Sequence, residues 1–336
     1  MRPCRRFAIA ARASGSSRLL RTRGRIPSPL GGVALALALA GCGKVGGTPD
    51  AAPSIDAASK DAASDAAHVA ICDPTAVFGS PALLPGFSTS ADEVAPRLSQ
   101  DELTLYFSSN PAAVTQAHDL YIAQRNRVQD PFGEAHALEP LNSAAEDYDP
   151  TLSADGKTLI FTSNRKTGEG FHLYVATRST TLAAFESAAL LDGVGSANTA
   201  DNDIFPFLSA DGQELWFSSN RLQTDARNYD IYRAVRGPSG FANPNPVMEL
   251  SSDTVELGVP SADLRTVYFH TKRGGGSTIW SSHRTTAADG FPAPHADTEL
   301  MVGASAIPGW MSPDNCRLYL NSSGPGDLYV ATRQPQ

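Results

Sequence analysis

The sequence is poor in cysteine and lacks the short motifs that mark common enzyme families. Its 336 residues include four cysteines. It contains no G-x-S-x-G nucleophile elbow, no H-E-x-x-H metal motif and no pair of histidines at metal-ligand spacing. Gly156-Lys157-Thr158 matches the end of a phosphate-binding loop, but the required upstream glycine is missing and a strand pattern follows. The sequence therefore carries no clear enzyme signature.

The apolar run near the N-terminus is too short to span a membrane as a helix. It covers residues 30–40, whereas a spanning helix needs about 20 apolar residues. Residues 1–41 hold eight arginines and no acidic residue, so the run follows a basic segment as in a signal peptide. It ends in Leu39-Ala40-Gly41-Cys42, which resembles the lipobox of bacterial lipoprotein precursors. This resemblance implies that residues 1–41 are removed and that the Cys42 sulfur carries a diacylglycerol.

The resemblance also implies export and a lipid anchor. Gly43 follows the cysteine, in place of the aspartate associated with inner-membrane retention in some bacteria. We therefore expect anchoring to the outer membrane, on its periplasmic or cell-surface side. Residues 42–72 consist mainly of Ala, Asp, Ser, Gly and Pro, which bury too little surface to offset their ordering entropy. This segment is predicted to be a disordered tether.

Positive charge is scarce in the part of the sequence that follows the predicted signal peptide. Without the arginines of residues 1–41, 19 basic residues remain against 35 acidic ones, a net charge of −16. Such a surface repels nucleic acid and anionic headgroups. Cys72 and Cys316 then remain as an even pair in an oxidising compartment, and they are predicted to form a disulfide.

From residue 73 to 336 the sequence repeats at a period of about fifty residues, which is typical of a stacked or radial repeat fold. Each copy has a serine-led turn, an apolar strand, a second short strand and a closing arginine. The five copies begin at Ser99, Ser153, Ser209, Ser261 and Ser312. Their closing arginines are Arg125, Arg178, Arg236, Arg284 and Arg333. Because these arginines recur at one offset in every copy, we expect them to be structural.

Each copy is predicted to be a meander of antiparallel strands. Asp155-Gly156 and Asp211-Gly212 are predicted two-residue hairpin turns, and Asn315 suits the same turn. Glu102 and Leu264 depart from this pattern, so another turn geometry is expected there. The strand that follows is apolar on both faces and must be covered on both. A β-propeller meets that demand, because each blade packs between two neighbours.

A fourth, outer strand pattern lies between successive copies, and one further example precedes the first copy at residues 78–84. The last copy ends without an outer strand. The sequence therefore predicts an all-β propeller of five four-stranded blades, with the ring closed by the N-terminal strand. Six blades would require a degenerate copy that the sequence does not show. Closure places Cys72 and Cys316 on the same face of the disc.

The motif S-x-D-G-x-x-[IL]-x-F-x-S-N-R resembles the WD40-like repeat of the TolB propeller family. It occurs at residues 153–165 and 209–221. The resemblance covers almost all of residues 73–336 and implies the fold, but not the function, because the matched residues build blades. TolB has six blades and a second domain, and binds a peptidoglycan-associated lipoprotein. This chain leaves no room for that domain, so the partner is not implied.

Carboxylates recur just before the first strand of the copies, at Glu93, Asp147, Asp149, Asp203 and Glu256. Because the innermost strands of a propeller line its channel, these side chains are candidates to converge at one mouth. Three interpretations stay open. They could hold a cation such as Ca²⁺, the one cofactor considered, through hard oxygen ligands. They could act as a glycosidase acid pair, or they could cap the loops that lead into the strands.

The function predicted from these features is a lipid-anchored, monomeric scaffold in the cell envelope. It would bind a protein, peptidoglycan or glycan through long loops on the face of the acids, since loops rather than blades carry specificity. The alternatives are a five-bladed glycosidase that uses channel carboxylates and a purely structural envelope component. A glycosidase would need aromatic residues as a sugar platform, whereas the aromatics here mostly occupy strand positions.

Overall fold

The computed structural model describes residues 72–87, 91–110, 117–166, 168–191, 201–223, 225, 227–323 and 326–334. These residues belong to one compact unit, Ser64–Gln336. The predicted signal peptide, Cys42 and nearly all of the tether lie outside the described residues. Within the described part, no helix is long and apolar enough to cross a membrane.

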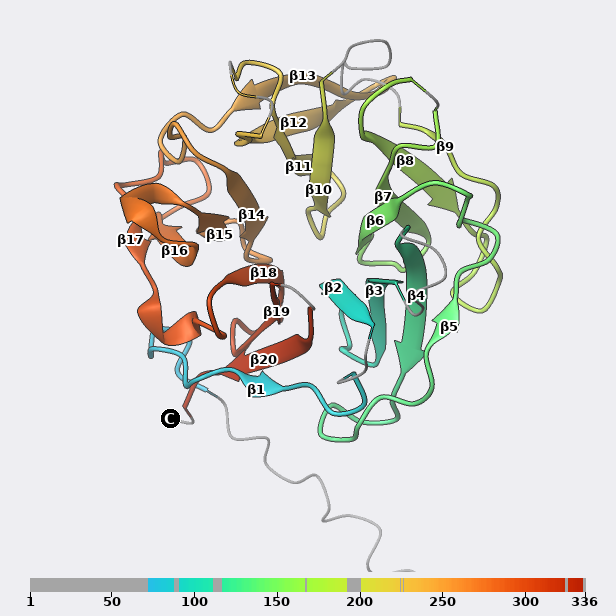
Figure 1. The fold of residues 1–336 in the computed structure, drawn as a ribbon, viewed down its shortest axis with the longest axis horizontal. Coiled ribbons are helices and arrows are strands. Elements are labelled where there is room, and N and C mark those ends of the chain that lie inside the picture. The colour runs from blue at the N-terminus through green and yellow to red at the C-terminus, as the bar shows by residue number, and fades with distance from the viewer. Residues whose placement is uncertain are drawn as a thin grey trace, which may run out of the picture. The chain divides into compact units, whose positions relative to one another are not determined.

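The prediction of a five-bladed, all-β propeller is confirmed: five four-stranded antiparallel sheets form a ring (Figure 1). The strands of the first blade are β2 (Asp92–Leu98), β3 (Thr104–Asn110), β4 (Asp119–Gln124) and β5 (His136–Ala137). Those of the second are β6 (Asp147–Leu152), β7 (Thr158–Ser163), β8 (His172–Thr177) and β9 (Ala189–Leu190). Those of the third are β10 (Asp203–Leu208), β11 (Glu214–Ser219), β12 (Asp230–Gly237) and β13 (Gly240–Pro246).

The last two blades follow the same order. The strands of the fourth are β14 (Glu256–Pro260), β15 (Thr266–Thr271), β16 (Thr278–His283) and β17 (His295–Ala296). Those of the fifth are β18 (Ala306–Met311), β19 (Arg317–Ser322), β20 (Leu328–Thr332) and β1 (Ala82–Leu83). Two short 3₁₀ helices accompany them, η1 (Arg273–Gly275) and η2 (Thr298–Leu300).

The ring is closed by the N-terminal strand, as predicted. Strand β1 pairs antiparallel with β20, and Phe78 forms an isolated bridge with Arg333. Strands at opposite ends of the described chain therefore make up one blade (Figure 1). Side chains of the first and fifth blades also share one apolar cluster, in which Leu98 and Phe107 join Trp310 and Leu328.

The turn between the first and second strands has one geometry in all five blades, and it is not the predicted two-residue turn. In the second blade the Ser153 amide bonds to the Thr158 carbonyl at 2.8 Å, so four residues form the loop. The residue three positions after each leading serine has a positive φ. It is Glu102 (59°), Gly156 (68°), Gly212 (68°), Leu264 (58°) and Asn315 (59°). The expectation of a different geometry at Glu102 and Leu264 was therefore wrong.

Side-chain hydrogen bonds hold this turn, also where glycine is absent: the Ser261 hydroxyl donates to Asp263 Oδ1 at 2.6 Å in the turn that contains Leu264. The Ser153 hydroxyl donates to Asp155 Oδ1 at 2.6 Å and accepts from the Thr158 amide at 2.9 Å. Asp155 Oδ1 also accepts from the Lys157 amide at 3.0 Å. In many turns a serine hydroxyl or an aspartate carboxylate accepts hydrogen bonds from backbone amides in this way. The S-x-D part of the repeat is therefore a turn motif.

The closing arginines tie the outer strand of each blade to this turn. Arg178 Nε donates to the Gly156 carbonyl at 2.7 Å, and its guanidinium carbon lies 4.4 Å from the centre of the Phe185 ring. All five arginines stack on an aromatic ring at 4.2–4.4 Å. Arg178 also donates to the Tyr106 hydroxyl of the preceding blade at 3.2 Å. Their role is structural, as expected from their repetition.

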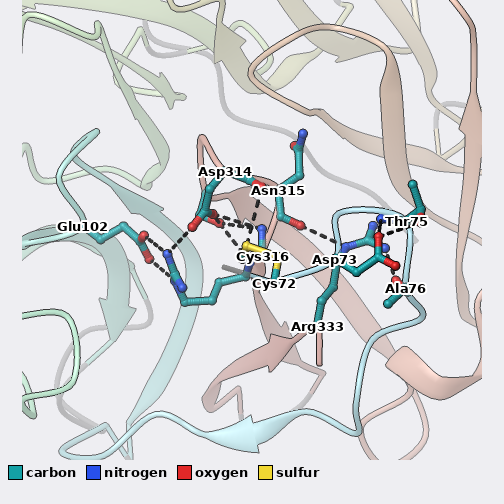
Figure 2. Close-up of a disulfide and its surroundings, with 11 residues drawn as sticks. Cys72, Asp73, Thr75, Ala76, Glu102, Asp314, Asn315, Cys316 and Arg333 are labelled. Carbon is teal, nitrogen blue, oxygen red and sulfur yellow. Dashed lines mark hydrogen bonds and ion pairs between the residues drawn. A yellow bond between two sulfur atoms is a disulfide. The ribbon is translucent and has the colours of Figure 1, made fainter. Parts of the chain in front are cut away.

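A disulfide between Cys72 and Cys316 fastens the ring closure (Figure 2). Their Cα atoms lie 5.8 Å apart although 244 residues separate them in the chain. Arg333 lies beside the bridge and bonds both to the Asn315 carbonyl, at 2.9 Å, and to the Ala76 carbonyl. The segment that precedes β1 is therefore held to the last blade covalently and by hydrogen bonds.

Removal of the disulfide should destabilise the domain. The double variant Cys72→Ser/Cys316→Ser is expected to lose about 2–4 kcal/mol in free energy of unfolding, because the bridge restricts a very long loop in the unfolded chain. Urea unfolding with and without reductant measures this. Reductant should lower the midpoint of the wild-type protein and leave that of the double variant unchanged. An equal response of both proteins would contradict the role of the bridge in closure.

The turn aspartates of the second and third blades, Asp155 and Asp211, should titrate below their usual range. The hydrogen bond from the Ser153 hydroxyl, and then that from the Lys157 amide, lower the pKa of Asp155 from 3.8. A group with a depressed folded pKa contributes stability above its unfolded pKa, and this is lost as pH falls through the folded value. In Ser153→Ala the pKa of Asp155 should rise toward 3.8, as followed by carboxyl NMR titration. The pKa of Asp211, lowered by its own serine, should stay unchanged.

Candidate binding site

Three of the five predicted site carboxylates form separate buried ion pairs. Arg165 reaches Asp147 at 2.5 Å, Arg221 reaches Asp203 at 2.6 Å and Arg273 reaches Glu256 at 3.0 Å. The three carboxylate side chains have no solvent exposure. Buried charges are stable only when they are paired and hydrogen-bonded. In the second and third blades these arginines are the last residue of the S-N-R motif.

These pairs belong to the scaffold of the blades. Asp147 Oδ2 accepts from the Ser143 amide at 2.7 Å and from the Ser143 hydroxyl at 2.9 Å, which caps the loop that leads into β6. The Arg165 guanidinium stacks on Phe161 and Tyr174, at 4.9 and 4.8 Å from the ring centres. Of the three interpretations of the acids, the one in which they cap the loops leading into the inner strands therefore applies to Asp147.

The predicted acids do not gather around one metal position. Among the described residues no group of three or more His, Cys, Asp or Glu side chains is placed to hold a metal ion. Glu93 occupies in β2 the position that Asp147 occupies in β6, and it is buried. The sequence has Pro111 where the second blade has Arg165. Of the five predicted acids, Asp149 is the one that lines the cavity at the mouth of the channel.

One residue near the start of each inner strand lines the mouth of the channel; it follows an acid in the first four blades and Ala306 in the fifth. Successive side chains of a strand point to opposite faces, so where the acid points into the blade its neighbour points into the channel. One apolar or aromatic residue comes from each blade, and we call these five the collar: Val94, Tyr148, Ile204, Leu257 and Ile307. They surround an open cavity of about 300 Å³. The alternation at the start of the inner strands was the signal that could have identified them.

Aromatic side chains from two loops complete the wall of this cavity. Phe171 and Tyr229 end the loops between the second and third strands of the second and third blades, and Phe205 comes from β10. The Tyr229 hydroxyl accepts a hydrogen bond from Asn202 at 3.1 Å. The sequence had suggested that the aromatics are mostly committed to strand packing. Most aromatic residues of the described chain do occupy strand positions, yet four rings gather at the mouth, two of them on strands and two on loops.

Asp149 is positioned by a β-bulge that three blades share. Ala95, Asp149 and Phe205 each precede a proline and have φ of 53°, 50° and 58°. A non-glycine residue in this region is uncommon and is often found at functional sites. Asp149 Oδ2 accepts from the Phe205 amide at 3.2 Å and from the Thr162 hydroxyl at 3.3 Å. Burial raises the pKa of Asp149, and the charge of Arg97 opposes that rise.

Arg97 is a residue of β2 in the first blade that reaches the Phe205 ring of the third blade. Its guanidinium carbon lies 4.7 Å from the centre of the Phe205 ring. Its Nη2 atom lies 3.5 Å from the Pro206 carbonyl of the third blade. The side chain is 1% exposed, and burial lowers its pKa to about 10. Sequence reasoning missed Arg97, although it stands where the other blades carry Thr151, Phe207, Val259 and Trp310.

The lining of the cavity is mostly apolar and holds few charged groups. Glycosidases need two carboxyl groups about 5–10 Å apart that flank the bond. Among the described residues that line the cavity, Asp149 is the only carboxylate. Apolar walls with a few polar groups are typical of ligand pockets.

The buried pair of Asp147 and Arg165 gives a direct test of its scaffold role. Arg165→Met should cost about 3–5 kcal/mol in free energy of unfolding, because it leaves a buried carboxylate without its cation. The double variant Asp147→Leu/Arg165→Met should recover most of that loss. Urea unfolding of the three proteins decides the matter. A single variant as stable as the wild type would show that the pair is not part of the scaffold.

No protein-family model matches the chain, and no curated protein matches it. Solved structures do resemble it. TolB from Acinetobacter baumannii is 15% identical with a TM-score of 0.41, over 73% of this chain and 55% of that one. A putative TolB from Agrobacterium tumefaciens is 15% identical with a TM-score of 0.43, over 70% and 72% of the two chains. This chain thus spans little more than half the length of the first.

A further similar structure is a glycoside hydrolase. Zg3597, a family 117 glycoside hydrolase of the marine bacterium Zobellia galactanivorans, is 11% identical with a TM-score of 0.50. The match covers 76% of this chain and 91% of that one. At such identities the likeness concerns the fold alone, and function has to be argued from the site. The chain is a β-propeller with TolB-like and glycoside hydrolase propellers among its structural neighbours.

Proposed function

We propose that this protein is a binding propeller of the cell envelope that engages a protein partner through the mouth of its central channel. The observation that carries the proposal is the collar, in which each blade contributes one apolar or aromatic residue to an open cavity. A cavity of about 300 Å³ lies at the lower end of the range for ligand pockets. It accommodates one large side chain or the end of a chain.

The chemistry of the wall favours a peptide group over a sugar. A sugar presents hydroxyl groups all round and needs a matching set of donors and acceptors. Asn321, one of the polar residues of the wall, is already engaged, since its Oδ1 accepts from the Ala95 amide and its Nδ2 donates to the Ser322 carbonyl. An inserted apolar or amphipathic side chain instead gains from covering the collar.

The sequence supports an envelope location for this interaction. The lipobox-like Cys42 and the acidic, small-residue tether would hold the propeller near a membrane surface. A domain held in this way meets other envelope proteins at high effective concentration. The partner is therefore expected among the proteins of the outer membrane and periplasm.

A photo-crosslinking experiment tests the proposal. The full-length protein with a photoreactive phenylalanine at Ile204 should crosslink to a defined envelope protein in cells. The added substitution Ile307→Asp should reduce the crosslink at least tenfold, because it places a charge in the apolar collar. Leu182→Asp is the matched control, since Leu182 is 97% exposed on the turn after β8.

The outcomes separate the candidate partners. Retention on isolated peptidoglycan sacculi, lost in Ile307→Asp, would replace the protein partner with peptidoglycan. A crosslink that is equally strong in Ile307→Asp and Leu182→Asp would overturn the role of the mouth.

A further inference from the structure

We propose that the mouth of the channel holds an organic cation, namely an alkylammonium group such as a lysine side chain or a trimethylammonium group. This inference rests on the proposed function and names the chemistry of the group that is inserted. It is drawn from two features of the same cavity, its aromatic wall and its single carboxylate.

The wall of the cavity contains four aromatic rings from the second and third blades. Tyr148, Phe171, Phe205 and Tyr229 all line the cavity. Tyr148 and Phe171 meet edge to face, with ring centres 6.2 Å apart. Cations are attracted to the faces of aromatic rings within about 6 Å of the ring centre, and this attraction is used to bind quaternary ammonium groups.

The carboxylate of Asp149 supplies the opposite charge within this wall. Both of its hydrogen bonds from described residues end on Oδ2, so Oδ1 retains its acceptor capacity. A charged hydrogen bond in a partly buried site is stronger than one in water. An alkylammonium group could therefore place its charge on Asp149 while its methylene or methyl groups contact the collar.

The surroundings of the mouth add negative rather than positive charge. His118 lies between Asp92, at 3.2 Å, and Glu146, at 3.5 Å, and its ring stacks on Tyr148 at 4.5 Å. The Tyr148 hydroxyl forms a hydrogen bond with Glu146. Two carboxylates thus face one imidazole beside the wall. Such a field attracts cations and repels anionic ligands.

Arg97 does not turn the cavity into an anion site. Its guanidinium stacks on the Phe205 ring, does not line the cavity and is almost fully buried. Its Nη1 and Nη2 atoms approach the carbonyls of Pro96 and Pro206. Asp149 is therefore the charged group that lines the cavity, while Arg97 acts on it from outside the lining through Coulomb attraction.

The test compares choline with 3,3-dimethyl-1-butanol, a neutral molecule of the same shape. Binding of each to the full chain is measured by NMR line broadening and isothermal titration calorimetry at constant ionic strength. Choline is expected to bind about tenfold more tightly than the neutral isostere, in keeping with cation–π and carboxylate attraction. Asp149→Asn should remove most of this preference, whereas Glu134→Gln, on an exposed loop between β4 and β5, should preserve it.

Two further variants separate a binding role from a folding defect. Tyr229→Phe keeps the ring and should retain choline binding, while Tyr229→Leu should weaken it several-fold. Equal affinity for choline and its isostere, or a preference unchanged in Asp149→Asn, would overturn the proposal. If the crosslink at Ile204 is nevertheless lost in Ile307→Asp, the partner-binding function stands and only the cationic nature of the inserted group falls.

Discussion

The whole structure depends on covering the middle strands of each blade on both faces. Strands such as Thr158–Ser163 are buried almost along their entire length, so an isolated blade would expose an apolar surface on each side. Side chains of neighbouring blades remove that surface from water, which is the main favourable contribution to folding. Every blade therefore needs two neighbours, and the ring must close. The pairing of β1 with β20 and the Cys72–Cys316 bridge satisfy this demand at the seam.

The seam is reinforced by a polar network that, among the described residues, no other pair of blades repeats in full. Glu102 occupies a turn of the first blade and binds Arg317 of the fifth through both carboxylate oxygens, at 2.7 and 2.5 Å. The Tyr319 hydroxyl donates to the same carboxylate at 2.9 Å. This use of Glu102 explains why a turn that takes glycine in the second and third blades carries a charged residue here. The cost of its positive φ is offset by contacts across the seam.

Repeated residues and exceptions to the repeat have different roles in this molecule. The serine, aspartate and arginine positions that recur in every blade make turns, caps and stacking contacts. Asp149 and Arg97 occur once each, at inner-strand positions where the other blades carry other residues. Both face the channel, where a five-fold arrangement would otherwise give an almost uniform apolar lining. In the proposed binding mode, specificity therefore comes from positions where the repeat is broken.

The sequence by itself determined the blade count, the closure by the N-terminal strand and the acids at the start of the inner strands. These follow from local turn chemistry and from the spacing of apolar residues, which are encoded within a few positions of each other. It could not decide that Asp147, Asp203 and Glu256 pair with Arg165, Arg221 and Arg273, nor that Asp149 alone faces the cavity. The face of the sheet to which a strand side chain points depends on the strand register and on β-bulges. A shift of one residue moves the side chain to the opposite face. Only the tertiary structure brought Tyr148, Phe171 and Tyr229 to one mouth, because they come from different blades and loops whose proximity exists only in the closed ring.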